Sequence, residues 1–258
     1  MKKSMITGIL FILFVSLLTA CGSSEQSKKG EQGEEKVLKM ATSADFPPFE
    51  SRDKEGNFEG FDIDLAQAIA DELGYKLEIE DMKFDGLVGA LQSKRVDMVL
   101  AGMSADEKRK KNVDFSKEYN RSGEMFISKA DQFASDLTAL KGKTVGVQLG
   151  TIQEEGADKL AEEYGFQVKK VDNASVLIQE LQSNRIDVAY MDKTVAKGYI
   201  DSQGLKGFDD PTTSSPGMGV AFPKGSDLVE KVNNILDKFE KDGTIDALKK
   251  KWLTEDQI

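Results

Sequence analysis

The chain has 258 residues, a formal net charge of −10, one cysteine and no histidine. The missing histidine excludes Ser-His-Asp and Cys-His catalytic arrangements and histidine-containing zinc sites, and a single cysteine can form neither an intramolecular disulfide nor a thiolate metal site. We therefore expect no metal and no cofactor. The acidic balance also argues against a nucleic-acid partner.

The N-terminus has the pattern of a secretory leader. Lys2 and Lys3 precede an apolar run over residues 5–17, which is too short to span a membrane comfortably. Small residues follow, and Cys21 comes directly after Ala20 with a polar tract behind it. This arrangement resembles a bacterial lipobox and predicts a signal peptide over residues 1–20.

Cys21 would then become the mature N-terminus and carry lipid on its sulfur, because a thiolate can be alkylated near neutral pH. Two acyl chains would hold the protein at the cell membrane, facing outside the cytoplasm. Residues 21–36 contain little apolar material and predict a flexible tether. The alternative is a secreted protein whose lone cysteine happens to lie near the cleavage site.

From Val37 onward the composition is globular, over about 220 residues, enough for one large domain or two small lobes. We expect a helix over residues 62–73, begun by Asp62 as N-cap and ended at Gly74. The pattern predicts strands at 37–41, 77–80 and 96–101, with a second helix at 86–93. The order then restarts with strands at 144–148, 168–171 and 186–190 and helices at 153–164 and 175–183. A strand at 219–222 and helices at 228–242 and 245–252 follow.

The β-α-β-α-β order thus occurs twice, which predicts an α/β fold of two doubly wound lobes with a cleft between them. We place lobe 1 at 37–120 plus 219–258 and lobe 2 at 121–218. Two hinge crossings are expected, near 119–123 and near 215–218.

An internal repeat indicates where the function lies. Residues 91–104 read LQSKRVDMVLAGMS and residues 181–192 read LQSNRIDVAYMD, at a constant offset of 90. Ligands of open α/β sheets bind outside the carboxyl ends of the strands. Gly102 and Asp192 are equivalent in the two copies, so the strand ends would face each other and form a cleft able to hold an ammonium group. The alternative is chance similarity between two ordinary α/β units.

Several phrases carry a family resemblance: SADFPPFE at 43–50, GFDIDL at 60–65, MKFDGL at 82–87, AGMSADEKRKKNVDFS at 101–116, VGVQLGTIQE at 145–154 and GVAFPKGS at 219–226. Together they resemble the amino-acid-binding lipoproteins of ABC importers, the polar amino acid family of extracellular solute-binding proteins, from Val37 to the end. Within that family they are most similar to arginine binders. The resemblance implies a monomer that is not an enzyme, binds an L-amino acid and serves an ABC permease and ATPase complex.

The resemblance also implies the site. Arg109 would hold the ligand carboxylate, helped by Thr151, the amide of Ile152 at a helix N-terminus, and Gln153. Ser104 would hydrogen-bond the carboxylate or the ammonium. The Gly102 carbonyl and Asp192 would bind the ammonium, and Phe46 and Phe84 would sandwich the ligand side chain. The commoner alternatives are a solvated basic run for Arg109, a helix cap for Asp192, and core packing for the two phenylalanines.

One departure leaves the specificity open. Ser43 stands where several relatives have an acid, so the group that reads the distal end of the ligand is undecided among Glu50, Glu124, Gln148 and Met191. Arginine is the expected ligand, with glutamine or cystine as alternatives. Two other functional classes stay open: an enzyme on the same fold, such as a cyclic-acid dehydratase using Asp192 or Glu154, and a sensory ectodomain, which would need a membrane span or signalling domain that the sequence does not show.

Overall fold

The computed structural model describes residues 36–253. The predicted leader, Cys21 and the tether up to residue 35 lie outside the described residues. Within the described part, no helix combines the length and the apolar character needed to cross a membrane.

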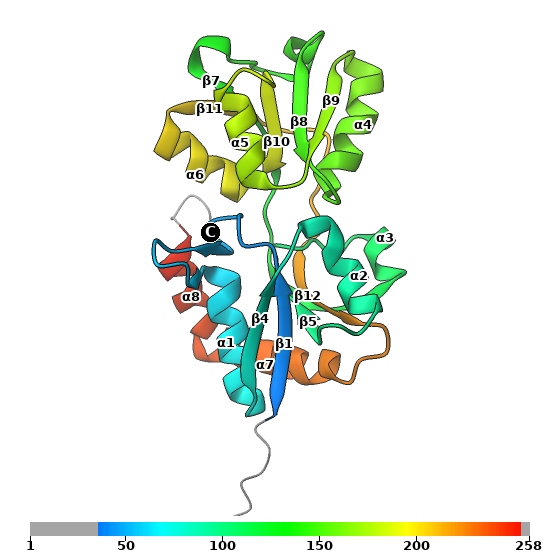
Figure 1. The fold of residues 1–258 in the computed structure, drawn as a ribbon, viewed down its shortest axis with the longest axis vertical. Coiled ribbons are helices and arrows are strands. Elements are labelled where there is room, and N and C mark those ends of the chain that lie inside the picture. Colours follow the sequence, from blue (N-terminus) through cyan, green and yellow to red (C-terminus); the bar gives the residue numbers. More distant parts are fainter. Residues whose placement is uncertain (1–35, 254–258) are drawn as a thin grey trace, which may run out of the picture. The chain divides into compact units, whose positions relative to one another are not determined.

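Two five-stranded sheets organise the described chain, one in each lobe (Figure 1). The sheet of lobe 1 has the order β4-β1-β5-β12-β6. Its strands are β1 (Val37–Thr42), β4 (Lys76–Asp81), β5 (Met98–Val99), β6 (Val113–Asn120) and β12 (Met218–Pro223). Strand β1 runs parallel to β4 and β5, as the sequence predicts, whereas β12 is antiparallel to β5 and β6.

The sheet of lobe 2 has the order β11-β7-β10-β8-β9. Its strands are β7 (Glu124–Lys129), β8 (Thr144–Gln148), β9 (Gln167–Val171), β10 (Val188–Asp192) and β11 (Leu205–Asp209). Strand β8 is parallel to β9 and β10, and β7 pairs antiparallel with β10 and β11. A small hairpin of β2 (Ser51–Arg52) and β3 (Phe58–Glu59) follows β1.

Helices pack on both sheets. Lobe 1 carries α1 (Phe61–Leu73), α2 (Leu87–Gln92), α3 (Glu107–Lys110), α7 (Leu228–Asp242) and α8 (Thr244–Trp252), and lobe 2 carries α4 (Ile152–Tyr164), α5 (Ala174–Gln182) and α6 (Lys193–Gln203). Leu38, Leu65 and Leu236 belong to one buried cluster, which continues through Tyr119 and Met125 into lobe 2. The apolar core is therefore continuous where the chain passes between the lobes.

The predicted cap of the first helix is wrong. Gly60, with φ 132°, precedes the helix, and a Cβ on it would meet the Phe49 carbonyl oxygen at 2.2 Å. Asp62 is the second helical residue and is fully buried. Its carboxylate accepts hydrogen bonds from the Gly102 amide and the Tyr119 hydroxyl instead of capping its own helix.

Two strands of the repeat also differ from their predicted bounds. The first is shortened to β5, Met98–Val99, and the second is shifted to β10, Val188–Asp192, so that Asp192 ends the strand instead of following it. Both copies share a turn before the strand, in which Lys94 and Asn184 have positive φ, 55° and 57°. After each turn an aspartate accepts a hydrogen bond from the neighbouring parallel strand, Asp97 from the Lys39 amide of β1 (2.8 Å) and Asp187 from the Thr144 amide of β8 (2.7 Å).

The chain passes from one sheet to the other through residues 121–123 and again through residues 210–217. Arg121 ties these two segments together, since its Nη1 donates to the Ser215 carbonyl at 2.8 Å. The lobe limits and the action of these segments as a hinge remain predictions.

Candidate functional site: a pocket between the strand ends

A pocket that is partly open to the solvent lies where strands of both sheets end. Its lining residues follow or end β1, β4, β5, β8 and β10, the position at which open α/β sheets bind ligands. The lining comprises Ser43, Asp45, Phe46, Glu50, Phe84, Ala101, Gly102, Ser104, Arg109, Gln148, Thr151, Ile152, Gln153 and Asp192. All nine residues expected from the sequence are therefore brought together; that they bind a ligand is still a prediction.

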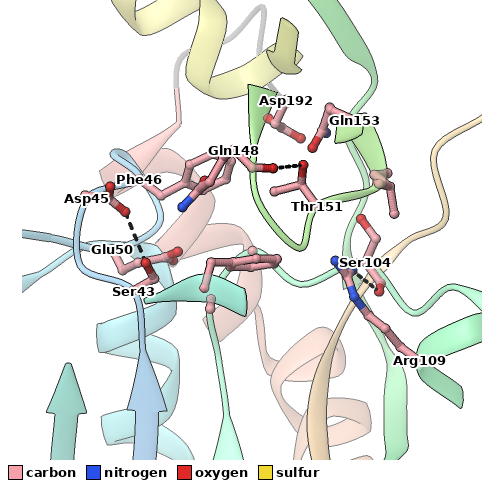
Figure 2. A pocket seen from close by; sticks show the side chains of 14 residues that line it. Ser43, Asp45, Phe46, Glu50, Ser104, Arg109, Gln148, Thr151, Gln153 and Asp192 are labelled. Atoms are coloured by element: carbon pink, nitrogen blue, oxygen red, sulfur yellow. Dashed lines mark hydrogen bonds between the residues drawn. The ribbon is translucent and has the colours of Figure 1, made fainter. Parts of the chain in front are cut away.

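Arg109 occupies one side of the pocket, next to Ser104 (Figure 2). The guanidinium donates to the carbonyl oxygens of Ser104 and Gly150, each at 2.8 Å, and its Nε lies 3.3 Å from Asp106 Oδ2. The Arg109 side chain is 9% exposed, and its carbon Cζ lies 5.3 Å from the Phe84 ring centroid. Burial lowers the pKa of Arg109 from its ordinary value, but an arginine stays charged in proteins, so the pocket holds a fixed cation here.

The N-terminus of α4 adds backbone donors beside this cation. Thr151 caps the helix: its Oγ accepts from the Glu154 amide, and its own proton goes to the Gln148 carbonyl at 2.7 Å. The Thr151 hydroxyl therefore already makes its hydrogen bonds within the protein. The group that can donate to an anion here is the Ile152 amide at the start of the helix. Gln153 is buried and donates to Glu124, so it supports the wall of the pocket.

Asp192 has both roles that the sequence left open. Its Oδ1 caps α6 by accepting from the amides of Thr194 (2.8 Å) and Val195 (3.2 Å), and its side chain also lines the pocket. Burial raises its pKa to about 6. The group is therefore an anion at neutral pH and is held in place by the helix it begins.

Gly102 adopts a positive φ of 54°, which brings the backbone close to the ring of Phe46. A Cβ at this position would meet Phe46 Cε1 at 3.0 Å. Phe46 stacks on Phe49 with ring centroids 6.1 Å apart, and both Phe46 and Phe84 are half-buried. Both aromatic side chains therefore line the pocket and are only partly buried in the core.

Acidic side chains form the side of the pocket away from Arg109. Figure 2 shows Ser43, Asp45 and Glu50 gathered there. Ser43 Oγ donates to Asp45 Oδ1 at 3.2 Å, and Asp45 Oδ2 accepts from the Ser175 amide of lobe 2 at 3.3 Å. Burial raises the pKa values of Asp45 and Glu50.

Of the four groups considered for the distal end, Glu50 and Gln148 line this pocket and Met191 is buried outside its lining. Glu124 lies behind it, bound to Gln153, in a neighbouring cavity. Asp45 is the acid that sequence reasoning missed. Its place between Ser43 and the predicted site residue Phe46, in the same short segment, was the available signal.

Nothing in the described residues resembles a metal centre, because no cluster of three or more carboxylate, thiol or imidazole groups has the required geometry there. The arrangement is instead a cation and helix amides on one side and several carboxylates on the other, separated by aromatic rings. Such a pocket suits a zwitterion with an additional positive charge.

Comparison with known proteins also indicates a protein that binds a small solute. Residues 38–255 match the family model of bacterial extracellular solute-binding proteins, family 3. The chain is 46% identical over 240 residues to the arginine-binding extracellular protein ArtP of Bacillus subtilis (strain 168), covering 92% of each chain. An ancestral arginine-binding protein solved with arginine superimposes with a TM-score of 0.80 at 43% identity, covering 84% of this chain and 98% of the other. The same kind of ancestral protein solved with glutamine gives 0.79 at 44% identity, covering 84% and 97%.

Proposed function

Because this chain belongs to the bacterial extracellular solute-binding proteins, family 3, we propose that it captures a cationic L-amino acid, arginine in preference to others, and delivers it to an ABC permease and ATPase complex. The observation that carries the proposal is the charge distribution of the pocket. One base, Arg109, faces three acids, Asp45, Glu50 and Asp192. Arginine presents charges of the opposite sign, one carboxylate for Arg109 and two cations for the acidic groups.

The headgroup would bind where the fixed donors are. Arg109 and the Ile152 amide would hold the α-carboxylate, with the Ser104 hydroxyl beside them, in charge-assisted hydrogen bonds. The ammonium would pair with Asp192 and donate to the Gly102 carbonyl. Burying each ligand charge next to an opposite charge limits the desolvation penalty that an unpaired ion would suffer.

The ligand side chain would lie along Phe46 and Phe84 toward Asp45 and Glu50. A guanidinium is planar and weakly hydrated, so it stacks on aromatic rings at a smaller desolvation cost than an ammonium. Each such contact contributes roughly 0.5–2 kcal/mol, which predicts about tenfold preference for arginine over lysine. A neutral glutamine side chain would leave the acidic side unmatched.

Competitive calorimetric titration tests the assignment, with arginine, lysine, ornithine, glutamine and cystine as ligands. We expect arginine to bind most tightly, lysine and ornithine less, and glutamine least. Displacement of arginine by equal glutamine or cystine would overturn the ranking but leave the headgroup site intact. Incubation with each ligand and with cyclic acids, followed by chromatography, tests the enzymatic alternative, since a binding protein returns its ligand unchanged.

We further propose that Cys21 is lipidated after removal of residues 1–20 and anchors the protein, as a monomer, on the outer side of the cell membrane. The support is the lipobox-like sequence and membership of an extracellular family. Labelling cells with radioactive palmitate should mark the wild type and leave Cys21→Ser unlabelled and released from the membrane fraction. Equal membrane retention of both forms would contradict the anchor.

A further inference from the structure

Two carboxyl side chains lie together beneath the acidic side of the pocket. Glu50 and Asp62 are both fully buried, and Glu50 lines the pocket. Asp62, in the first turn of α1, lies behind it: its amide donates to the carbonyl of Phe49, the neighbour of Glu50, at 2.9 Å. The two carboxyl groups are neighbours, and each affects the pKa of the other.

The donors around this pair are unevenly distributed. Asp62 Oδ2 accepts from the Gly102 amide at 2.7 Å and from the Tyr119 hydroxyl at 2.8 Å. Within residues 36–253, Asp62 Oδ1 and both carboxyl oxygens of Glu50 have no donor. Two buried, acceptor-only groups side by side cannot both ionise without strong repulsion, and a proton on one supplies the hydrogen bond that the other lacks. Since Asp62 already has two fixed donors, the proton belongs on Glu50.

The other groups around Glu50 also favour its protonated form. The charged or titratable groups that face Glu50 are Asp62, Asp45 and Asp192, and no base lines its side of the pocket among the residues described. Tyr119 is buried and its pKa is raised, so it remains a neutral donor. Burial and these carboxylates hold the pKa of Glu50 well above its ordinary value, whereas that of Asp62 is about 6.

We propose that Glu50 carries a proton in the free protein and loses it when the cationic end of a ligand reaches the acidic side of the pocket. The O–H bond of Glu50 breaks, the proton passes to the solvent, and the resulting carboxylate pairs with the guanidinium or ammonium, which keeps its own protons. Asp62 does not touch the ligand; it is a positioning residue that sets where the proton sits. The inference rests on the proposed function and deepens it, because cationic ligands would release a proton and neutral ones would not.

The coupling makes affinity depend on pH with a definite sign. Binding lowers the pKa of Glu50, so between the bound and free values arginine binds with release of one proton and its affinity rises with pH. The rise approaches about tenfold per pH unit where release is complete. Since burial and like charges raise the pKa of Glu50 well above its ordinary value, we expect the effect on the alkaline side of that ordinary value.

Titration of the wild-type protein tests whether arginine binding releases a proton. Calorimetry with arginine at pH 7 in phosphate and in Tris, whose protonation enthalpies differ, gives the number of protons released per ligand; we expect close to one. Affinity for arginine should rise across the pH range, while affinity for glutamine, measured the same way, should stay flat. Arginine binding without proton release, or equal release with glutamine, would overturn the proposal.

Variants test whether the proton released on binding comes from Glu50. Glu50→Gln should abolish the release and weaken arginine more than glutamine, and Asp62→Asn should move the pH dependence of the arginine affinity to lower pH. Glu78→Gln, an exposed position on β4, is the matched control and should behave as the wild type. Release that persists in Glu50→Gln would contradict the proposal even if Asp62→Asn fails to fold. Failure of every cationic amino acid to bind would instead contradict the proposed function itself.

Discussion

At the scale of single residues, the site is held in place by the protein before a ligand contributes anything. The guanidinium of Arg109 is fixed by two carbonyl oxygens, and Asp192 is fixed by the amides of the helix that it caps. Such preorganisation reduces the ordering cost of binding. It also predicts that removal of either charge is costly, since the ligand charge opposite would then be buried without a partner.

Arg109→Ala and Asp192→Asn should each weaken amino acid binding by about 2–5 kcal/mol. Calorimetry with arginine measures the loss, and a thermal melt confirms that each variant is folded. Lys110→Ala, next to Arg109 but exposed, is the control and should bind normally. Wild-type affinity in either pocket variant would remove that residue from the site.

Glu124 predicts a pH dependence of stability. It is buried, and burial together with the neighbouring Asp192 raises its pKa from 4.5 to about 8. A raised carboxyl pKa stabilises the fold below the unfolded value, and this contribution is lost as pH rises toward the folded value. Glu124→Gln removes that loss, so between pH 5 and pH 8 its stability relative to the wild type should rise by roughly 3–4 kcal/mol.

Thermal melts at several pH values measure this difference, with the exposed Glu162→Gln on α4 as control. A constant offset between Glu124→Gln and wild type across the range would show that Glu124 does not titrate there.

The sequence predicted which residues line the Arg109 and Asp192 parts of the pocket better than it predicted the acidic side. Arg109 and Asp192 occur in phrases whose order fixes their place, whereas the distal group depends on how one loop folds. Reciprocal backbone bonds between Phe46 and Glu50, at 2.8 and 3.2 Å, curl that loop and bury Glu50. Such a turn is decided by three-dimensional packing, and no spacing in the sequence distinguishes Glu50 from Asp45.

At the scale of elements, strongly patterned segments were predicted well and the pair β6 and β7 was missed. The helices α4, α5, α7 and α8 and the parallel strands have clear periodicity, and glycines end α4 and α7, at Gly165 and Gly243. Helix α6 and strand β11 were not among the predicted elements. Strands β6 and β7 are separated only by residues 121–123, and the segment was interpreted as a hinge crossing. Strand β6 pairs antiparallel with β12 in the sheet of lobe 1, and β7 pairs antiparallel with β10 and β11 in the sheet of lobe 2. Local sequence does not reveal these pairings.

The loop after β8 gives a test of lobe contact. Gly150 has a φ of 79°, and a Cβ on it would meet Asp85 Cα of the other lobe at 2.8 Å. Gly142 has a similar φ of 74° but nothing within 4 Å. Alanine at either position should cost about 1–2 kcal/mol of stability from the left-handed backbone. Only Gly150→Ala should also weaken arginine binding, by about tenfold or more, because it obstructs closure around the pocket.

Melting curves and titrations of the two glycine variants separate these effects. Equal arginine affinity in Gly150→Ala and Gly142→Ala would show that the approach of Gly150 to Asp85 is not needed for binding.

At the scale of the whole molecule, ion pairs join the two lobes. Lys83 of lobe 1 pairs with Asp172 of lobe 2, and Lys108 pairs with Glu155. These side chains are largely exposed, so each pair contributes little alone and is weakened by salt. The ligand, with charges buried against both lobes, would supply most of the energy that keeps them together.

Ligand-driven closure is therefore the expected motion, with bending near the two predicted crossings. Strand β12 has register shifts at Met218/Gly219 and Gly219/Ala221, directly after the second crossing, and such irregular pairing lets a strand bend. Small-angle scattering should show a smaller radius of gyration at saturating arginine than without it, and no change for Arg109→Ala at the same concentration. An unchanged radius in the wild type, under conditions where calorimetry shows full occupancy, would mean that the lobes are already closed when the ligand enters and that the crossings do not act as a hinge.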